Sequence, residues 1–213
     1  MSTLSTELSF PAATDAVRAT PEPVDARALS DHELMLAVRA GDLARLGDLF
    51  ERHQQPLYGF FVRITGQRTA SEDLVQLVFY RILKYRHTYR DEGKFSAWIY
   101  HLARKVAADH FRKHTSKVAR DVEPEVVEAL PDHSPKPDEK AARNDDLAFM
   151  QSALSQLPDE QREVLVLHRF QNLRHDEIAR LLDCSVGAVK VRAHRALATL
   201  RDVYFRLRRE RLA

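Results

Sequence analysis

The most regular pattern of apolar and polar positions lies in residues 175–201. Its first part favours a short helix over about 175–182, whose apolar residues share one face: Ile178, Leu181 and Leu182. Residues 183–185 then favour a tight turn, because Asp183 tolerates a bent backbone and Ser185 can cap the next helix. The pattern predicts two helices joined by a short turn.

The second of these helices has an apolar face and a basic face. Apolar residues recur every three or four positions and form the inward face: Val189, Ala193, Ala196, Leu197 and Leu200. Cations lie on the opposite face or its flanks: Lys190, Arg192, His194, Arg195 and Arg201. A short two-helix unit with a cationic second helix fits a DNA major groove, so the pattern predicts a DNA-binding helix-turn-helix. A basic face that is only solvated is the alternative interpretation.

The N-terminal half predicts helices as well. Ser30 and Glu33 have the spacing of a capping box, so the first helix is expected to begin there and to end before Gly41. A second helix is expected over about 43–65. Pro56 should kink this helix or start a new turn, because proline lacks the backbone N–H that an interior turn requires.

Two further helices follow Gly66, which should end the second helix. The third is expected from near Ser71 to about Tyr85, and the fourth over about 95–115. The fourth helix has an apolar stripe that we expect to face inward: Phe95, Ile99, Leu102, Val106 and Phe111. Few stretches alternate with a period of two, so the predicted fold class is all-α.

This pattern divides the chain into two helical domains joined by a flexible linker. Residues 1–28 are rich in Ser, Thr, Ala and Pro without periodicity and are expected to be a flexible extension. Residues 29–115 form the predicted four-helix domain, residues 116–143 a Pro-containing acidic linker, and residues 144–213 a second, smaller domain.

Charge is distributed unevenly along the chain, although the net charge of the 213 residues is only +2. Eight cations and two acids lie between residues 190 and 211, whereas nine acids and five cations lie between residues 115 and 146. Such blocks indicate segments that meet different surfaces.

The single cysteine, Cys184, excludes an intrachain disulfide and fits a reducing compartment. No long apolar run or secretory signal occurs, so we expect a cytoplasmic protein without membrane insertion.

The predicted fourth helix and the loop before it combine aromatic rings with cations. Trp98 and Tyr100 lie on the helix among Arg104 and Lys105, and Tyr89 lies in the loop. Single-stranded nucleic acid is bound by such sets, because rings stack on exposed bases and cations follow the backbone. Packing of these aromatic rings in or beside the core is the alternative interpretation.

These motifs together resemble those of a known family. SEDLVQLVFYRILKYRHTYRDEGKFSAWIYHLARKVAADHFRKH at 71–114 is followed by the acidic linker, LPDEQREVLVLHRF at 157–170 and the helix-turn-helix. The series resembles the extracytoplasmic-function (ECF) sigma factors of the sigma-70 family, which are small two-domain initiation factors of bacterial RNA polymerase. The resemblance covers about 29–205.

The resemblance implies two contacts with core RNA polymerase, on the coiled coil of its largest subunit and on its flap. The third helix would dock on the coiled coil through Asp73, Gln76 and Phe79. Leu77 departs from the family pattern, which usually has an acid there. The resemblance also implies an anti-sigma factor that holds the protein inactive and a stress- or signal-responsive set of genes.

The resemblance further implies that the chain binds promoter DNA as both double and single strands. The minus-ten element would be opened and bound by residues of the loop and the fourth helix: His87, Tyr89, Arg90, Lys94, Trp98, Arg104 and Lys105. The minus-thirty-five element would be bound by the helix-turn-helix: Ser185, Lys190, Arg192, His194 and Arg195. The acidic linker would pass through the RNA path of the polymerase. No cofactor, metal site or catalytic residue is implied.

Two other function classes fit single features of the sequence. The C-terminal helix-turn-helix also resembles that of response-regulator transcription factors, but residues 29–115 do not alternate the strands and helices of a receiver domain. A metal-dependent nuclease could use Asp109, His110 and His114. However, the chain has no HExxH motif, no paired-carboxylate motif and no Gly-rich phosphate loop. We therefore do not expect an enzyme.

Overall fold

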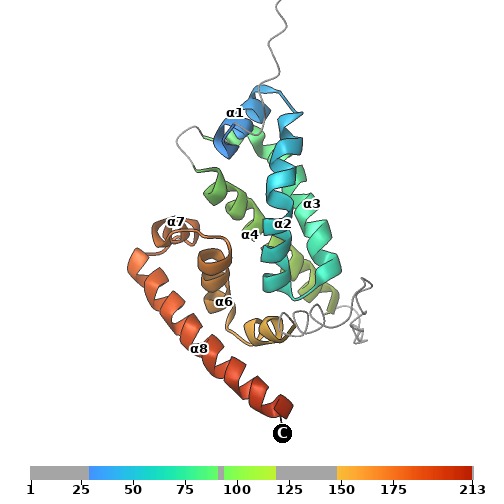
Figure 1. The fold of residues 1–213 in the computed structure, drawn as a ribbon. Helices are drawn as coiled ribbons and strands as arrows, with labels where there is room; N and C mark the ends of the chain where they lie inside the picture. Colours follow the sequence, from blue (N-terminus) through green and yellow to red (C-terminus); the bar gives the residue numbers. More distant parts are fainter. Residues whose placement is uncertain (1–28, 91–93, 119–147, 213) are drawn as a thin grey trace, which may run out of the picture.

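The computed structural model describes residues 29–90, 94–118 and 148–212, which contain helices and turns but no β-strand. This confirms the all-α prediction. The predicted extension 1–28 and most of the predicted linker lie outside the described residues. Two groups of helices stand side by side (Figure 1), one formed by the N-terminal helices and the other by the C-terminal helices.

The N-terminal group is the predicted four-helix domain. Its helices are α1 (Asp31–Ala40), α2 (Arg45–Thr65), α3 (Arg68–Tyr85) and α4 (Phe95–Val118), with the short 3-10 helix η1 (Arg86–Thr88) between the last two. The C-terminal group begins with a helical segment at 148–155. It continues with α6 (Asp159–Leu165), the π-helix η2 (Val166–Phe170), α7 (His175–Leu181) and the long α8 (Val186–Leu212).

The beginning and end of α1 follow the sequence prediction. The backbone N–H of Ser30 donates to the Glu33 carboxylate at 2.7 Å, and the Ser30 hydroxyl accepts from the Glu33 N–H at 3.3 Å. These two bonds are the expected capping box, which satisfies N–H groups that have no partner within the helix. Gly41 ends α1 with a φ of 113°, a conformation that a glycine adopts without strain.

Helix α2 follows the predicted range, whereas the structure corrects the beginning of α3. Helix α2 begins at Arg45 and continues through Pro56. Helix α3 begins at Arg68, not near Ser71, because the chain leaves the left-handed Gly66 through one extended residue, Gln67, and can turn helical at once. Ser71 is therefore buried inside the helix, where its hydroxyl donates to the Gln67 carbonyl.

The core of the N-terminal domain is formed where its four helices meet. Fully buried side chains come from every helix, among them Leu34, Phe60, Ile82 and Ile99. The apolar stripe of α4 is buried as expected, except for Phe111, which is 41% exposed. Phe111 lies near the C-terminal end of α4 and borders a cavity between the two domains, so its ring has no core to enter.

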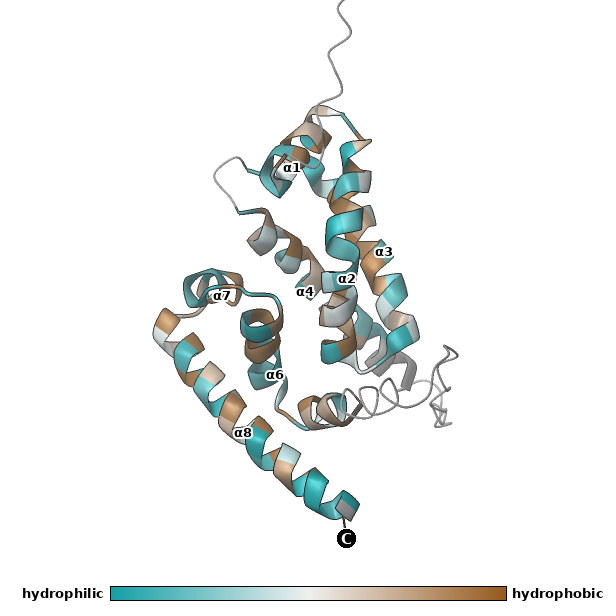
Figure 2. Ribbon diagram, viewed as in Figure 1, coloured by the Kyte–Doolittle hydropathy of each residue, from teal (hydrophilic) through white to brown (hydrophobic). Residues whose placement is uncertain are grey.

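One continuous apolar cluster contains buried residues of both domains. Val166, Leu167 and Leu173 of the C-terminal domain belong to the same cluster as the core of the four-helix domain. A second, smaller cluster joins α8 to α6 and the segment 148–155: Leu154, Leu157, Leu165 and Ala196. Figure 2 shows hydrophobic and hydrophilic positions alternating along α8, as expected for a helix that is buried on one face.

Replacement of Ser30 by alanine should lower the free energy of unfolding by about 1 kcal/mol, because the α1 capping bond is lost. Urea unfolding followed by circular dichroism measures this change. The matched control is Ser30→Asn, which keeps a capping oxygen and should stay close to the unmodified protein. An equal loss in both variants would contradict the capping role.

Candidate nucleic-acid interface

The helix-turn-helix has the predicted turn. Asp183 takes a φ of 51°, which Asp tolerates better than most residues, and the N–H of Cys184 donates to the Ala179 carbonyl at 3.0 Å. The hydroxyl of Ser185 accepts from the Ala188 N–H at 3.1 Å and caps α8. The turn therefore fixes the angle at which α8 leaves α7.

Helix α8 presents a basic outer face. Lys190, His194 and Arg195 are exposed, and Val191 between them is 49% exposed. The inward face holds the buried residues Val189, Ala193 and Ala196, as expected, while Leu197 is 39% exposed and departs from the prediction. Ser185 at the beginning of the helix is exposed as well.

Arg192 differs from the other cations of α8 because its side chain is tied to neighbouring elements. Its guanidinium lies 3.2 Å from the carboxylate of Glu160, a residue of α6, and donates to the sulfur of Cys184 at 3.9 Å. These contacts connect α8 to the turn and to α6. Arg192 thus helps to orient the basic face as well as adding charge to it.

The loop before α4 places its predicted DNA-binding residues in different environments. His87 and Arg90 are exposed. Tyr89, in contrast, is 2% exposed, and its hydroxyl lies 2.7 Å from Nδ1 of His32. The Tyr89 carbonyl accepts from Arg39 at 2.8 Å. In this conformation α1 holds the Tyr89 ring in the core, so the ring does not face solvent, and its contact with DNA stays a prediction.

Trp98 and Lys105 lie on the surface of α4. Trp98 is half-buried and packs edge-on against Tyr89, with ring centroids 5.1 Å apart, and Lys105 is exposed. Near them, burial and the charges of Lys105 and Arg104 lower the pKa of His101. This part of α4 is cationic, with one aromatic ring at its edge.

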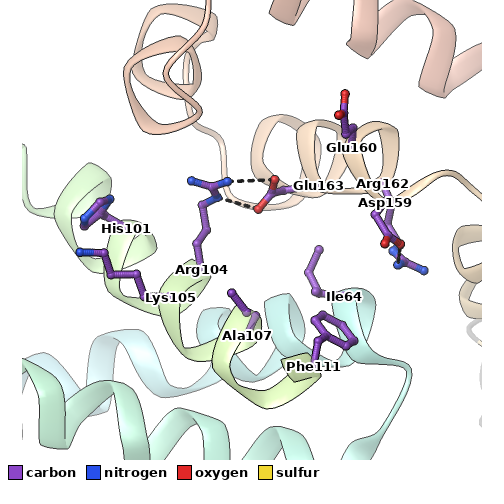
Figure 3. A pocket seen from close by; sticks show the side chains of 11 residues that line it. Ile64, His101, Arg104, Lys105, Ala107, Phe111, Asp159, Glu160, Arg162 and Glu163 are labelled. Carbon is purple, nitrogen blue, oxygen red and sulfur yellow. Dashed lines mark hydrogen bonds and ion pairs between the residues drawn. The ribbon is translucent and has the colours of Figure 1, made fainter. Parts of the chain in front are cut away.

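Arg104 and Lys94 are occupied by the C-terminal domain. The guanidinium of Arg104 binds both carboxylate oxygens of Glu163, at 2.6 and 3.2 Å, and also donates to the Leu181 carbonyl at 2.7 Å. Figure 3 shows Arg104 reaching from α4 to Glu163 on α6. Lys94 lies 2.9 Å from the carboxylate of Glu177, a residue of α7. Both predicted DNA-binding cations thus face the other domain.

Other contacts join the same two surfaces. The Tyr100 hydroxyl donates to the side chain of Gln171, and burial raises the pKa of Tyr100 far above its usual range. The side chain of Gln151 donates to the Val62 carbonyl at 2.6 Å, and the Arg63 guanidinium lies 4.1 Å from the ring centroid of Phe170. Sequence reasoning missed these partners, because no local pattern marks contacts between residues 59 to 107 positions apart.

The α3 surface predicted to bind polymerase is only partly available. Asp73 and Gln76 are exposed, and Gln76 lines a cavity of about 480 Å³ with Phe50 of α2. Phe79 is only 7% exposed and packs edge-on against Phe50, with centroids 4.9 Å apart. Phe79 therefore packs beneath that surface in this structure, and its contact with polymerase stays a prediction. Leu77 is half-buried against the core.

Both domains match sigma factor families. Residues 49–117 match the family model described as "Sigma-70 region 2", and residues 150–200 match "Sigma-70, region 4". The ECF RNA polymerase sigma factor SigX of Bacillus subtilis (strain 168) is 32% identical over 167 residues, which cover 76% of this chain and 84% of SigX. The chain belongs to the ECF sigma factors of the sigma-70 family.

Other comparisons agree with this assignment. The chain is 31% identical to the RNA polymerase sigma factor CarQ of Myxococcus xanthus over 159 residues. These residues cover 73% of this chain and 87% of CarQ. The solved structure of CnrH, in complex with the cytosolic domain of CnrY, superposes with a TM-score of 0.63 at 25% identity. That match covers 81% of this chain and 96% of CnrH.

The assignment also bears on the rival functions. Region 2 occupies the N-terminal half of this sigma factor, where a response regulator would have its receiver domain. Sigma factors are transcription initiation factors.

Within the described ranges, no group of three or more His, Cys, Asp or Glu side chains could hold a metal ion. A membrane-spanning helix is also absent from these ranges.

Acidification should weaken the contact between Lys94 and Glu177. Burial raises the pKa of Glu177, but hydrogen bonds from Lys94 and the Arg174 N–H, with the charges of both cations, outweigh it and lower the pKa overall. Because the folded pKa lies below the unfolded value of about 4.3, this stabilisation is present above that pH and is lost as pH falls through the lowered pKa.

Urea unfolding of the unmodified protein and of Glu177→Gln, measured from about pH 7 to about pH 3, tests this effect. The difference in free energy of unfolding between the two proteins should shrink towards acid pH. A difference that stays constant across this range would contradict the role given to the Glu177 charge.

Proposed function

We propose that this sigma factor binds core RNA polymerase through α3 and carries it to promoters that α8 and α4 recognise. The observation that supports this most directly is the exposed basic face of α8 formed by Lys190, His194 and Arg195, directly after a capped helix-turn-helix turn and within the region 4 match. In the proposal, this face enters the major groove of the minus-thirty-five element.

The chemistry of the α8 face suits this task. An arginine or lysine can bind a guanine edge or neutralise a phosphate, and a good base contact discriminates by about 1–3 kcal/mol. Val191 adds an exposed apolar side chain at the centre of the face, which can contact a thymine methyl group. Ser185 and Arg192 would support this face, Ser185 as the cap and Arg192 as the link to α6.

In the proposal, the loop and α4 recognise the minus-ten element. Exposed His87, Arg90 and Lys105 provide donors for the backbone, and half-buried Trp98 provides a ring at the melting junction. Unpairing a base costs a few kcal/mol, and capture of the extruded base offsets part of that cost. Tyr89 would position Trp98, because its ring packs against Trp98 and its carbonyl accepts from Arg39 of α1.

The partners follow from the same assignment. Asp73 and Gln76 would contact the coiled coil of the largest polymerase subunit, and region 4 would contact the flap. An anti-sigma protein is proposed as the inhibitor of this sigma factor, in a stress or signal response in the cytoplasm. The similarity to CnrH, which was solved in complex with the cytosolic domain of CnrY, supports a protein partner of this kind.

Arg195→Ala should lower initiation from a cognate promoter about tenfold while leaving polymerase binding intact, because one major-groove contact is lost. In vitro transcription with core polymerase on a genomic fragment library first identifies the promoter and then measures the effect. Arg208→Ala, an exposed arginine of α8 outside the region 4 match, serves as the control. The absence of any new start site with the unmodified protein would overturn the proposed function.

Asp73→Asn should weaken the association with core polymerase severalfold, because an exposed charge of the proposed docking surface is removed. Fluorescence anisotropy with labelled sigma factor and core enzyme measures the dissociation constant. Asp202→Asn makes the same charge change on α8 and should leave the constant unchanged. Equal effects of the two variants would show that α3 is not the docking helix.

A further inference from the structure

The C-terminal domain covers the part of α4 that is proposed to handle melted DNA. In Figure 1, α6 and α7 stand beside α4, and α8 lies on the outer side of the C-terminal group. The contacts pair cations of the first domain with acids of the second: Arg104 with Glu163, and Lys94 with Glu177. Two of the minus-ten contacts predicted from the sequence, Lys94 and Arg104, are thus already occupied within the chain.

Arg104 has little capacity left for DNA in this conformation. Three of its nitrogen atoms donate to the C-terminal domain, two to the Glu163 carboxylate and one to the Leu181 carbonyl. A guanidinium binds carboxylate and phosphate with the same two-pronged geometry. Glu163 therefore occupies the position in which a DNA phosphate would meet Arg104, and both cannot be bound together.

Lys94 and Glu177 form a second pair of the same kind. The Glu177 side chain is only 6% exposed, whereas that of Lys94 is 61% exposed. A buried carboxylate requires partners, and Glu177 has Lys94 at 2.9 Å together with the Arg174 N–H at 2.9 Å. Loss of Lys94 to a DNA phosphate would leave Glu177 with less compensation, so DNA binding by Lys94 opposes the packed arrangement.

We propose that Glu163 and Glu177 hold the free sigma factor closed by acting as phosphate mimics on α4, and that promoter DNA must displace them. The proposal rests on the proposed minus-ten role of α4. Apolar contacts shared by the two domains bring the surfaces together, and the two acids decide which face of α4 is covered. Polymerase and DNA would then select the open arrangement of the two domains.

The test compares Glu163→Gln/Glu177→Gln with the control Asp202→Asn/Glu210→Gln, which changes the net charge equally on exposed acids of α8. Small-angle X-ray scattering measures the radius of gyration of each free protein. Fluorescence anisotropy measures binding of a labelled single-stranded DNA oligonucleotide. The first variant should have a larger radius of gyration and should bind DNA about fivefold tighter than the control.

Either of two results would overturn the proposal: an unchanged radius of gyration, or a gain in DNA affinity no greater than that of the control. A charge exchange keeps the test decisive if the glutamine variant fails to fold. Glu163→Arg alone should open the protein, and Arg104→Glu/Glu163→Arg should restore the compact form. Because scattering needs neither polymerase nor promoter, a failure of closure is distinguishable from a failure of the proposed sigma function.

Discussion

The arrangement of the two domains depends on the guanidinium of Arg104. A partly buried guanidinium requires acceptors for its N–H groups, and here they come from two elements of the C-terminal domain, Glu163 on α6 and the carbonyl of Leu181 at the end of α7. These contacts fix both elements against α4. Since α7 leads directly into the turn before α8, the same contacts also fix the direction of the basic face of α8.

Both proposed promoter contacts are built on helices that are held from behind. Tyr89 supports Trp98 on one side, and its carbonyl is held by Arg39 of α1. Arg192 connects α8 to α6 through Glu160. Two DNA-binding surfaces carried by one polymerase complex can share the affinity through effective concentration. The low net charge of +2 is consistent with such sharing, because neither surface must bind tightly alone.

The N-terminal domain separates its packing residues from its exposed polar residues within single helices. On α3, Phe79 lies beneath the surface against Phe50, while Asp73 and Gln76 point outward. The motif that carries the family resemblance therefore contains one residue for stability and two that are available for a partner. Leu77 stands where the family pattern usually has an acid. Its side chain is half-buried and packs against the core.

Local physical rules were sufficient for the elements that the sequence alone determined. The capping box at Ser30, the left-handed Gly66 and the turn at Asp183 depend on neighbours a few residues away, as does the basic face of α8. Tertiary structure alone decided that Tyr89 is buried and that Arg104 meets Glu163. That contact joins residues 59 positions apart, and no local preference encodes a partner that becomes adjacent only when two domains pack.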